Sequence, residues 1–343
     1  MSPTKPIIGH VNNRCLQQDV QGLIGKLGRF AWLAAGLPVI LGNCGCTAHR
    51  PVPLLVRHAP ASVAGKPGER LNFKLVTYNI WGLPSWINGA RQERFRGIAR
   101  ELEDLDPDII LLQEAWTAKS RLAVPSSWRW SMARASGQHT FFHQNGLVTL
   151  SKFPIIDGEF HPFSRAAFPD CLVRKGALKV TLQLPDGQIV NVWNVHLQQG
   201  GAPEIRRSQI HELVAAVQAA DDGQLADVIG GDFNCTPGSI LFHELETALG
   251  PTVHQICGTK PFITWRAAKA KRAREETLDH IFVRPSRTLQ ETRAFARLVF
   301  APPDHRERLS DHLGIEATLE LVPTTTRARG TTELAFAQGS NAP

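Results

Sequence analysis

The 343-residue sequence lacks the short motifs that mark the commonest nucleotide and nucleophile sites. It has no Walker A loop and no GxGxxG stretch, so neither a P-loop nor a dinucleotide-binding site is indicated. No GxSxG elbow occurs, and Ser310 in "SDH" is therefore not expected to be a triad nucleophile. The six cysteines form no pair of CxxC units, which argues against a zinc site. Three of them precede residue 50 and the other three are widely spaced, so at most one bridge could form among these three and a disulfide scaffold is not expected.

The composition is that of an ordinary globular protein with a mild excess of positive charge. The hydrophobic fraction is 43%, the net charge is +7 and the isoelectric point is near 9.3. This balance suits an anionic partner such as a phosphate ester, a nucleic acid or a lipid headgroup. Part of the excess lies in the run "KAKRAR", Lys269 to Arg274, which we interpret as a solvated face rather than a dedicated binding patch.

The first 49 residues resemble an export leader. Lys26 and Arg29 precede an apolar run, Phe30 to Leu41, which has the length of a signal peptide and is too short to span a bilayer. Cys44 then stands where bacterial lipoproteins carry their lipidated cysteine, although Asn43 departs from that pattern. We therefore predict an exported protein, either secreted or a periplasmic, membrane-anchored lipoprotein; the alternative is a buried or interfacial apolar helix.

The rest of the chain divides into three parts that differ in composition and in the periodicity of their apolar residues. Residues 50–70 are rich in proline and glycine and are predicted to be a linker, residues 71–322 a single domain, and residues 323–343 a disordered tail. Within the domain, apolar residues at helical spacing predict helices at 91–105 and 203–220. Strands are expected at 73–80, 107–116, 146–155, 177–184, 188–197, 226–234, 276–283, 293–300 and 312–321.

Strands outnumber helices, and several are apolar throughout. The stretches "IILLQE" and "ADVIGG" require burial on both faces, so we expect an α/β fold in which at least two sheets pack face to face under helices.

Polar residues stand at the ends of six of the expected strands. They are Asn79, Glu114, His196, Asp232 with Asn234, Asp279, and Asp311 with His312. Taken one at a time, such residues have a simpler explanation, because Asp and Asn are common in the turns that follow strands. Together they supply hard oxygen ligands, which favour Mg²⁺, with Mn²⁺ and Ca²⁺ as alternatives, and two histidines for acid–base chemistry. Without a covalent nucleophile, this set indicates metal-assisted attack of water on a phosphate ester.

The ordered motifs resemble the endonuclease/exonuclease/phosphatase superfamily, which has the fold of pancreatic deoxyribonuclease. The stretches that carry the resemblance are "TYNIWGLP", "LLQEAW", "GLVTLSKFPI", "RKGALKVTL", "NVHLQ", "GGDFNCTP", "LDHIFV" and "LSDHLGIEATL". The resemblance implies a four-layered α/β sandwich, with two mixed β-sheets packed face to face and helices outside. It also implies a metal-dependent phosphodiesterase.

The same resemblance implies roles for individual residues. Glu114 corresponds to the metal-binding glutamate, Asn79 to the asparagine that supports the metal and the phosphate, and Asp311 to an acid near the metal. His312 would activate water or contact the scissile phosphate, with Asp279 as its orienting carboxylate; His280 replaces the aromatic that usually follows that aspartate.

Three further residues complete the implied set. His196 corresponds to the general acid toward the leaving oxygen, and Asp232 and Asn234 to the GDxN pair. If "GGDFN" is extended, residues two apart face the same way. Asp232 and Asn234 would then both face the cleft, where the amide could donate to a phosphate oxygen, while Phe233 turns into the core.

The details resemble the neutral sphingomyelinases most within the superfamily. Lys175 could neutralise the substrate phosphate, and its alternative interpretation is an exposed lysine at a strand start. We therefore favour a phospholipid headgroup as the partner of a monomeric enzyme. The stretch "FITWRAAKAKRAR", with Phe262 and Trp265, could touch a membrane surface or a nucleic acid. The alternatives are a nuclease of the same fold and, less favoured because every matched position is filled, a binding module on an inactive scaffold.

Overall fold

The computed structural model describes residues 52–57, 71–85, 92–125, 131–135, 145–221, 223, 225–266, 274–284, 286, 289–302 and 308–323. All of them belong to one compact unit, Cys46–Pro343. The predicted leader with Cys44, residues 269–273 of the basic run and residues 324–343 of the predicted tail lie outside the described residues.

The strands form two mixed sheets that share one strand at an edge. Sheet A has the spatial order β12 (Asp279–Arg284), β9 (Ala226–Asp232), β8 (Ile189–His196), β7 (Gly176–Gln183), β6 (Ile155–Pro162). Sheet B has the order β4 (Ser131–Ala135), β5 (Val148–Ser151), β3 (Ile109–Gln113), β2 (Leu71–Asn79), β14 (Gly314–Pro323), β13 (Leu289–Val299). Strand β1 (Val52–Arg57) pairs with both β4 and β6.

The pairings β2–β3 and β8–β9 are parallel, and the others are antiparallel. The predicted hairpin between β7 and β8 is present. Its turn is closed by the Gly187 N–H, which donates to the Leu184 carbonyl at 2.9 Å, and Gly187 has the positive φ of 86° that favours glycine there. A small second hairpin pairs β10 (Trp265–Arg266) with β11 (Glu275–Glu276).

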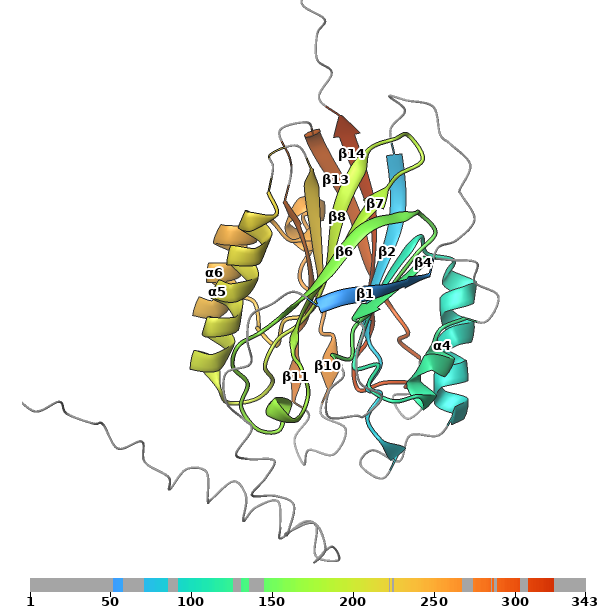
Figure 1. Cartoon of the computed structure of the whole chain (residues 1–343), viewed down its shortest axis with the longest axis vertical. Helices are drawn as coiled ribbons and strands as arrows, with labels where there is room; N and C mark the ends of the chain where they lie inside the picture. The colour runs from blue at the N-terminus through green and yellow to red at the C-terminus, as the bar shows by residue number, and fades with distance from the viewer. Residues whose placement is uncertain are drawn as a thin grey trace, which may run out of the picture. The chain divides into compact units, whose positions relative to one another are not determined.

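Helices cover both outer faces. Helices α5 (Pro203–Ala219) and α6 (Ile240–Leu249) lie on one side of the sheets and α4 (Gln92–Leu105) on the other, as Figure 1 shows. The remaining short elements are α7 (Val253–Cys257), η1 (Lys119–Ala123) and η3 (Asp170–Leu172). Apolar clusters fill the space between the two sheets and beneath each helix layer. The predicted four-layered α/β sandwich is therefore confirmed.

Two expectations about strands are wrong. The stretch 146–155 is not one strand, because Pro154 cannot donate to a ladder and the chain crosses there from β5 in sheet B to β6 in sheet A. The stretch 50–70, predicted to be a linker, contains β1, which joins the two sheets.

Cys171 is disulfide-bonded, whereas Cys235 and Cys257 are free thiols, so no bridge joins these three cysteines to one another. In the described part of the chain, every helix is too short or too polar to cross a membrane.

Candidate active site

Strand register gathers the predicted residues at one end of the sandwich. Asp232, at the end of β9, is opposite Asp279 of β12 on one side and His196 of β8 on the other. In sheet B, Asn79 of β2 is opposite Gln113, directly before Glu114. The carboxyl ends of two parallel strand pairs therefore point the same way, one pair in each sheet.

The backbone at these strand ends has unusual conformations. Gly231 has a φ of 147°, and a side chain there would overlap the backbone of Val195. Glu114 and Asn234 have positive φ values of 59° and 50°, which cost energy in residues other than glycine. Such strain is typical of functional sites, where neighbouring structure holds a residue in place.

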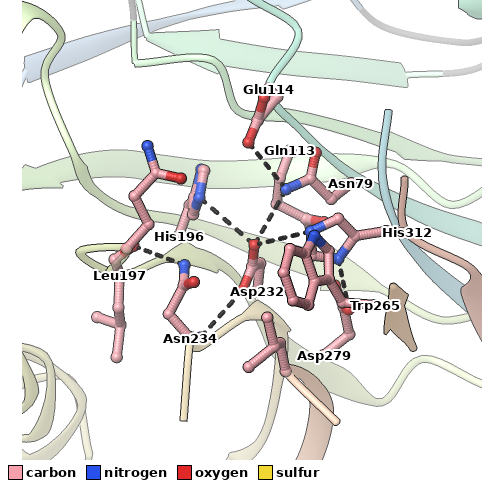
Figure 2. A network of polar contacts seen from close by, with 12 residues as sticks. Asn79, Gln113, Glu114, His196, Leu197, Asp232, Asn234, Trp265, Asp279 and His312 are labelled. Carbon is pink, nitrogen blue, oxygen red and sulfur yellow. Dashed lines mark hydrogen bonds and ion pairs between the residues drawn. The ribbon is translucent and has the colours of Figure 1, made fainter. Parts of the chain in front are cut away.

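Asp232 is the centre of the polar cluster (Figure 2). Its Oδ2 accepts a hydrogen bond from the Asn79 amide at 3.0 Å, and it lies 3.5 Å from Nε2 of His196 and 3.7 Å from Nε2 of His312. Its Oδ1 accepts from the backbone N–H of Asn234 at 2.9 Å. Burial raises the pKa of this carboxyl to about 6, although the positive charge of His312 acts in the opposite direction.

Glu114 lies on the other side of Asn79. Its Oε1 accepts a hydrogen bond from the same Asn79 amide nitrogen at 3.1 Å. Loss of solvent, followed by the negative charge of Asp311, raises the pKa of Glu114 to about 7. The Asp311 carboxylate is held by the indole N–H of Trp265, which donates to Oδ2 at 3.3 Å. Among the described residues no cationic side chain is hydrogen-bonded to Glu114, although the charges of Lys175 and His312 act to lower its pKa.

His312 and Asp279 form the predicted pair. Nδ1 of His312 lies 2.8 Å from Oδ2 of Asp279, which is fully buried. Burial alone would lower the pKa of His312, but the charges of Asp279 and Asp232 outweigh it and raise the pKa to about 10. The carboxylate therefore fixes the proton on Nδ1 and leaves Nε2 facing Asp232.

Lys175 is not the exposed lysine of the alternative interpretation, because only 3% of its surface is accessible. Its Nζ lies 2.7 Å from Nε2 of His196 and 3.2 Å from Oδ2 of Asp170. An ammonium can only donate, so Nε2 of His196 accepts and the ring proton is on Nδ1. Burial, then the charge of Lys175, places the pKa of His196 well below its usual value. In this arrangement Nε2 is not a proton donor, and the general-acid role of His196 stays a prediction.

The expected geometry of "GGDFN" is only half right. Phe233 is fully buried, as predicted. Asn234, however, is in the left-handed region rather than extended, and its amide donates to the Leu197 carbonyl at 3.1 Å. Asn234 therefore lies beside the cluster because the chain turns after Asp232, and one of its two amide N–H groups is already used.

Sequence reasoning missed several residues that hold this site. Gln113 donates to Oδ1 of Asn194 at 2.8 Å and so connects sheet B to sheet A directly beneath the cluster. Both are fully buried, and strand alternation could have found Asn194, which is two residues before His196. Gln113 depends on strand register, which places it opposite Asn79. Asp170, at the start of the short helix η3, lies in a stretch without periodicity and gave no such signal.

Two groups of side chains offer ligand atoms for a cation. Asp232, Asp279 and His312 have candidate ligand atoms within 4.8 Å of one another. Oδ2 of Asp279 and Nδ1 of His312 are hydrogen-bonded to each other, so these two atoms are already paired, whereas Oδ1 of Asp279 has no partner among the described residues. Glu114, Asn79 and Asp311 offer hard oxygens instead, although the Asn79 oxygen already accepts from the Trp81 N–H at 3.0 Å. Burial is the main cause of the raised pKa of Glu114, and the charge of Asp311 adds to it. Both groups are therefore candidates for holding a divalent cation.

Comparison with known proteins agrees with this geometry. The model of the Endonuclease/Exonuclease/phosphatase family matches residues 76–312. A Drosophila melanogaster protein, provisionally named a neutral sphingomyelinase, is 26% identical over 274 residues, which are 73% of this chain and 61% of that protein. The inositol phosphosphingolipids phospholipase C of Schizosaccharomyces pombe is 29% identical over 189 residues, or 52% of this chain and 44% of that protein. The chain thus spans less than two thirds of either relative.

Solved structures share the fold at low identity. A double mutant of beta toxin from Staphylococcus aureus, with bound magnesium ions, is 18% identical with a TM-score of 0.57, covering 72% of this chain and 99% of that one. TDP2 of D. rerio, complexed with a single-strand DNA product, is 18% identical with a TM-score of 0.59, and the match covers 72% of this chain and 98% of that one.

Proposed function

Because the chain belongs to the Endonuclease/Exonuclease/phosphatase family, we propose that it is a divalent-metal-dependent phosphodiesterase whose substrate is a sphingomyelin-like phospholipid. One observation carries the proposal. Strand ends from both sheets bring an asparagine, three acids and two histidines into a single cluster centred on Asp232. Such a cluster, without a covalent nucleophile, suits attack by water on a phosphate ester.

The cation would be held by Glu114, Asn79 and Asp311. Mg²⁺ is favoured by their oxygen donors, with Mn²⁺ and Ca²⁺ as alternatives. When bound, it supplies positive charge to the phosphoryl oxygens and makes the phosphorus more electrophilic.

The chain's own residues would orient the substrate and move protons. Asp279 holds His312 with Nε2 directed at the cluster, so a water or phosphate oxygen placed there meets a fixed nitrogen. The carboxylate of Asp232, between the two histidines, is placed to accept a proton from water. Lys175 brings a buried ammonium beside His196, and its positive charge favours the phosphate anion.

The substrate class is proposed from the relatives. The two curated relatives are named for enzymes of sphingolipids, and the match covers 61% and 44% of their length. A buried lysine for the phosphate and a net positive charge fit an anionic headgroup at a membrane surface. A nuclease is the second candidate, because a protein of this fold binds a DNA product. We extend the proposal to export through the leader of residues 1–49, with a monomer as the working form.

An activity assay with a matched variant tests the proposal. Purified protein is incubated with sphingomyelin vesicles, phosphatidylcholine vesicles and single- or double-stranded DNA, with Mg²⁺ or with excess EDTA. We expect Mg²⁺-dependent release of phosphocholine from sphingomyelin alone. Glu114→Gln should abolish it while the far-UV spectrum stays unchanged, and the exposed Glu93→Gln should keep it.

The outcomes separate the parts of the proposal. DNA cleavage without lipid turnover would replace the phospholipid by nucleic acid. Full activity of Glu114→Gln, or turnover in EDTA, would refute the metal assignment.

A further inference from the structure

A three-residue segment, Thr264–Arg266, lies against the "SDH" stretch that carries Asp311 and His312. The Leu313 N–H donates to the Thr264 carbonyl at 2.7 Å, and the Arg266 N–H donates to the Asp311 carbonyl at 3.3 Å. Trp265 and His312 form a backbone bridge between them. The hairpin that contains β10 is therefore attached to the site through its backbone.

The side chain of Trp265 continues this attachment. Its indole N–H donates to Oδ2 of Asp311 at 3.3 Å, and Figure 2 shows the ring beside His312 and Asp279. An indole nitrogen has one hydrogen and accepts nothing, so this contact can only orient an acceptor. Among the described residues, the Asp311 carboxylate has one more hydrogen-bond partner, the Ser310 hydroxyl, which is 3.4 Å from Oδ1 and also donates to the Asn79 carbonyl at 2.7 Å. Trp265 is thus the contact that is dedicated to Asp311.

Thr264 holds the backbone of Asp279, the acid that is hydrogen-bonded to His312. Its hydroxyl oxygen accepts from the backbone N–H groups of Leu278 and Asp279 at 3.0 and 3.2 Å, and the residue is fully buried. One segment therefore holds the start of β12 through Thr264 and the Asp311 carboxylate through Trp265. From the sequence, this stretch could touch a membrane surface or a nucleic acid. Ile263 is 49% exposed, but Trp265 is half-buried and its indole faces Asp311.

We propose that Trp265 is a positioning residue of the cation site, which it serves by orienting the carboxylate of Asp311 through its indole N–H. The inference rests on the proposed function, since Asp311 is a cation ligand only there. A carboxylate free to rotate presents its oxygens to a cation less often, and partners that orient ligands typically change metal affinity by roughly 10- to 100-fold. The 3.3 Å length of this bond places the expected effect at the lower end, about tenfold.

The test compares Trp265→Phe with a matched control in the same full-length protein. Phenylalanine keeps an aromatic ring and removes the N–H. The control is Trp193→Phe, because the Trp193 indole also donates to a carboxylate, Oδ1 of Asp227 near the start of β9, at 2.9 Å, but packs in the apolar cluster beneath α5 and α6 and not in the polar cluster. Titration calorimetry with MgCl₂ gives the dissociation constant, and steady-state assays at saturating and limiting MgCl₂ give kcat and KM.

We expect the Mg²⁺ dissociation constant to rise about tenfold in Trp265→Phe and to stay unchanged in Trp193→Phe. Excess Mg²⁺ should restore kcat in Trp265→Phe, and thermal melting should show a larger loss of stability in Trp193→Phe, whose indole is fully buried. Equal Mg²⁺ affinity in Trp265→Phe and wild type would overturn this inference alone. A wild type that takes up no Mg²⁺ would overturn the metal assignment of the proposed function and this inference with it.

Discussion

Replacing His280 by phenylalanine tests quantitatively whether burial in the core beneath the site keeps this histidine neutral. His280 directly follows Asp279, at a position where the family resemblance implies an aromatic residue. Its ring is fully buried among Phe233, Phe242 and Phe282, with 4.6 Å between its centroid and that of Phe242. Nε2 lies 2.8 Å from the Cys235 carbonyl, so it carries the proton and donates. The histidine is thus packed as an aromatic ring.

Burial lowers the pKa of His280 from 6.5 to about 4. Because the folded pKa is below the unfolded one, the unfolded chain binds more protons between these values. His280 therefore stabilises the fold fully above pH 6.5, and that stability is lost as the pH falls toward 4. Linkage gives a loss of about 2 kcal/mol between pH 7 and pH 5. Phenylalanine at position 280 cannot titrate and should remove this loss.

The assay is urea unfolding of wild type and His280→Phe at pH 7 and pH 5. The variant leaves the Cys235 carbonyl without its donor, which costs about 1–3 kcal/mol at both pH values. The informative quantity is therefore the difference in free energy of unfolding between wild type and variant, compared at the two pH values. All other titrating groups are the same in both proteins, so their contributions cancel. The difference should shift by about 2 kcal/mol in favour of the variant at pH 5. A difference that is the same at both pH values would refute the argument that burial keeps His280 neutral.

Two further substitutions probe the site and its support. His312→Ala should lower kcat by roughly 10²–10⁴-fold with a folded spectrum, since it removes the nitrogen that Asp279 orients; a change confined to KM in steady-state assays would make His312 a binding residue. Gln113→Leu leaves Oδ1 of Asn194 without its donor inside the sandwich and should lower the free energy of unfolding by about 1–3 kcal/mol. A urea midpoint equal to that of wild type would show that the Gln113–Asn194 bond does not hold the sheets together.

The sequence predicts the fold wherever periodicity and burial agree. Helix α4 buries Phe95, Ile98 and Leu102 at the expected spacing, and β3 and β9 are buried throughout their length. Strand β1 could not be predicted, because it pairs at the junction of the two sheets with partners about 75 to 110 residues away. Local composition carries no information about such distant pairing, and the prolines near β1 pointed to a linker instead.

For the site, residue types at strand ends predicted which side chains would meet, and the structure brings all of them to one end of the sandwich. Their orientation was harder to predict. Asn234 departs from the extended geometry because its backbone N–H folds back onto the Asp232 carboxylate. Asp170 and Trp265 act on site residues from loops or short hairpins, and only tertiary contacts reveal them.

The polar cluster lowers the stability of the fold, and this supports a functional reason for its presence. Within the described residues, buried polar atoms without a partner include Nδ1 of His196, Oδ1 of Asp279 and Oε1 of Gln113. Each such atom costs about 1–3 kcal/mol, comparable with a large part of the stability of an ordinary domain. An apolar side chain at any of these strand ends would remove the cost, as Leu111 and Val192 do one or two rows deeper between the sheets. The unpartnered atoms of His196, Asp279 and Gln113 gather at the end of the sandwich where Asn79, His196 and Asp232 meet, which is expected if the chemistry of that end, and not the stability of the sandwich, determines its residues.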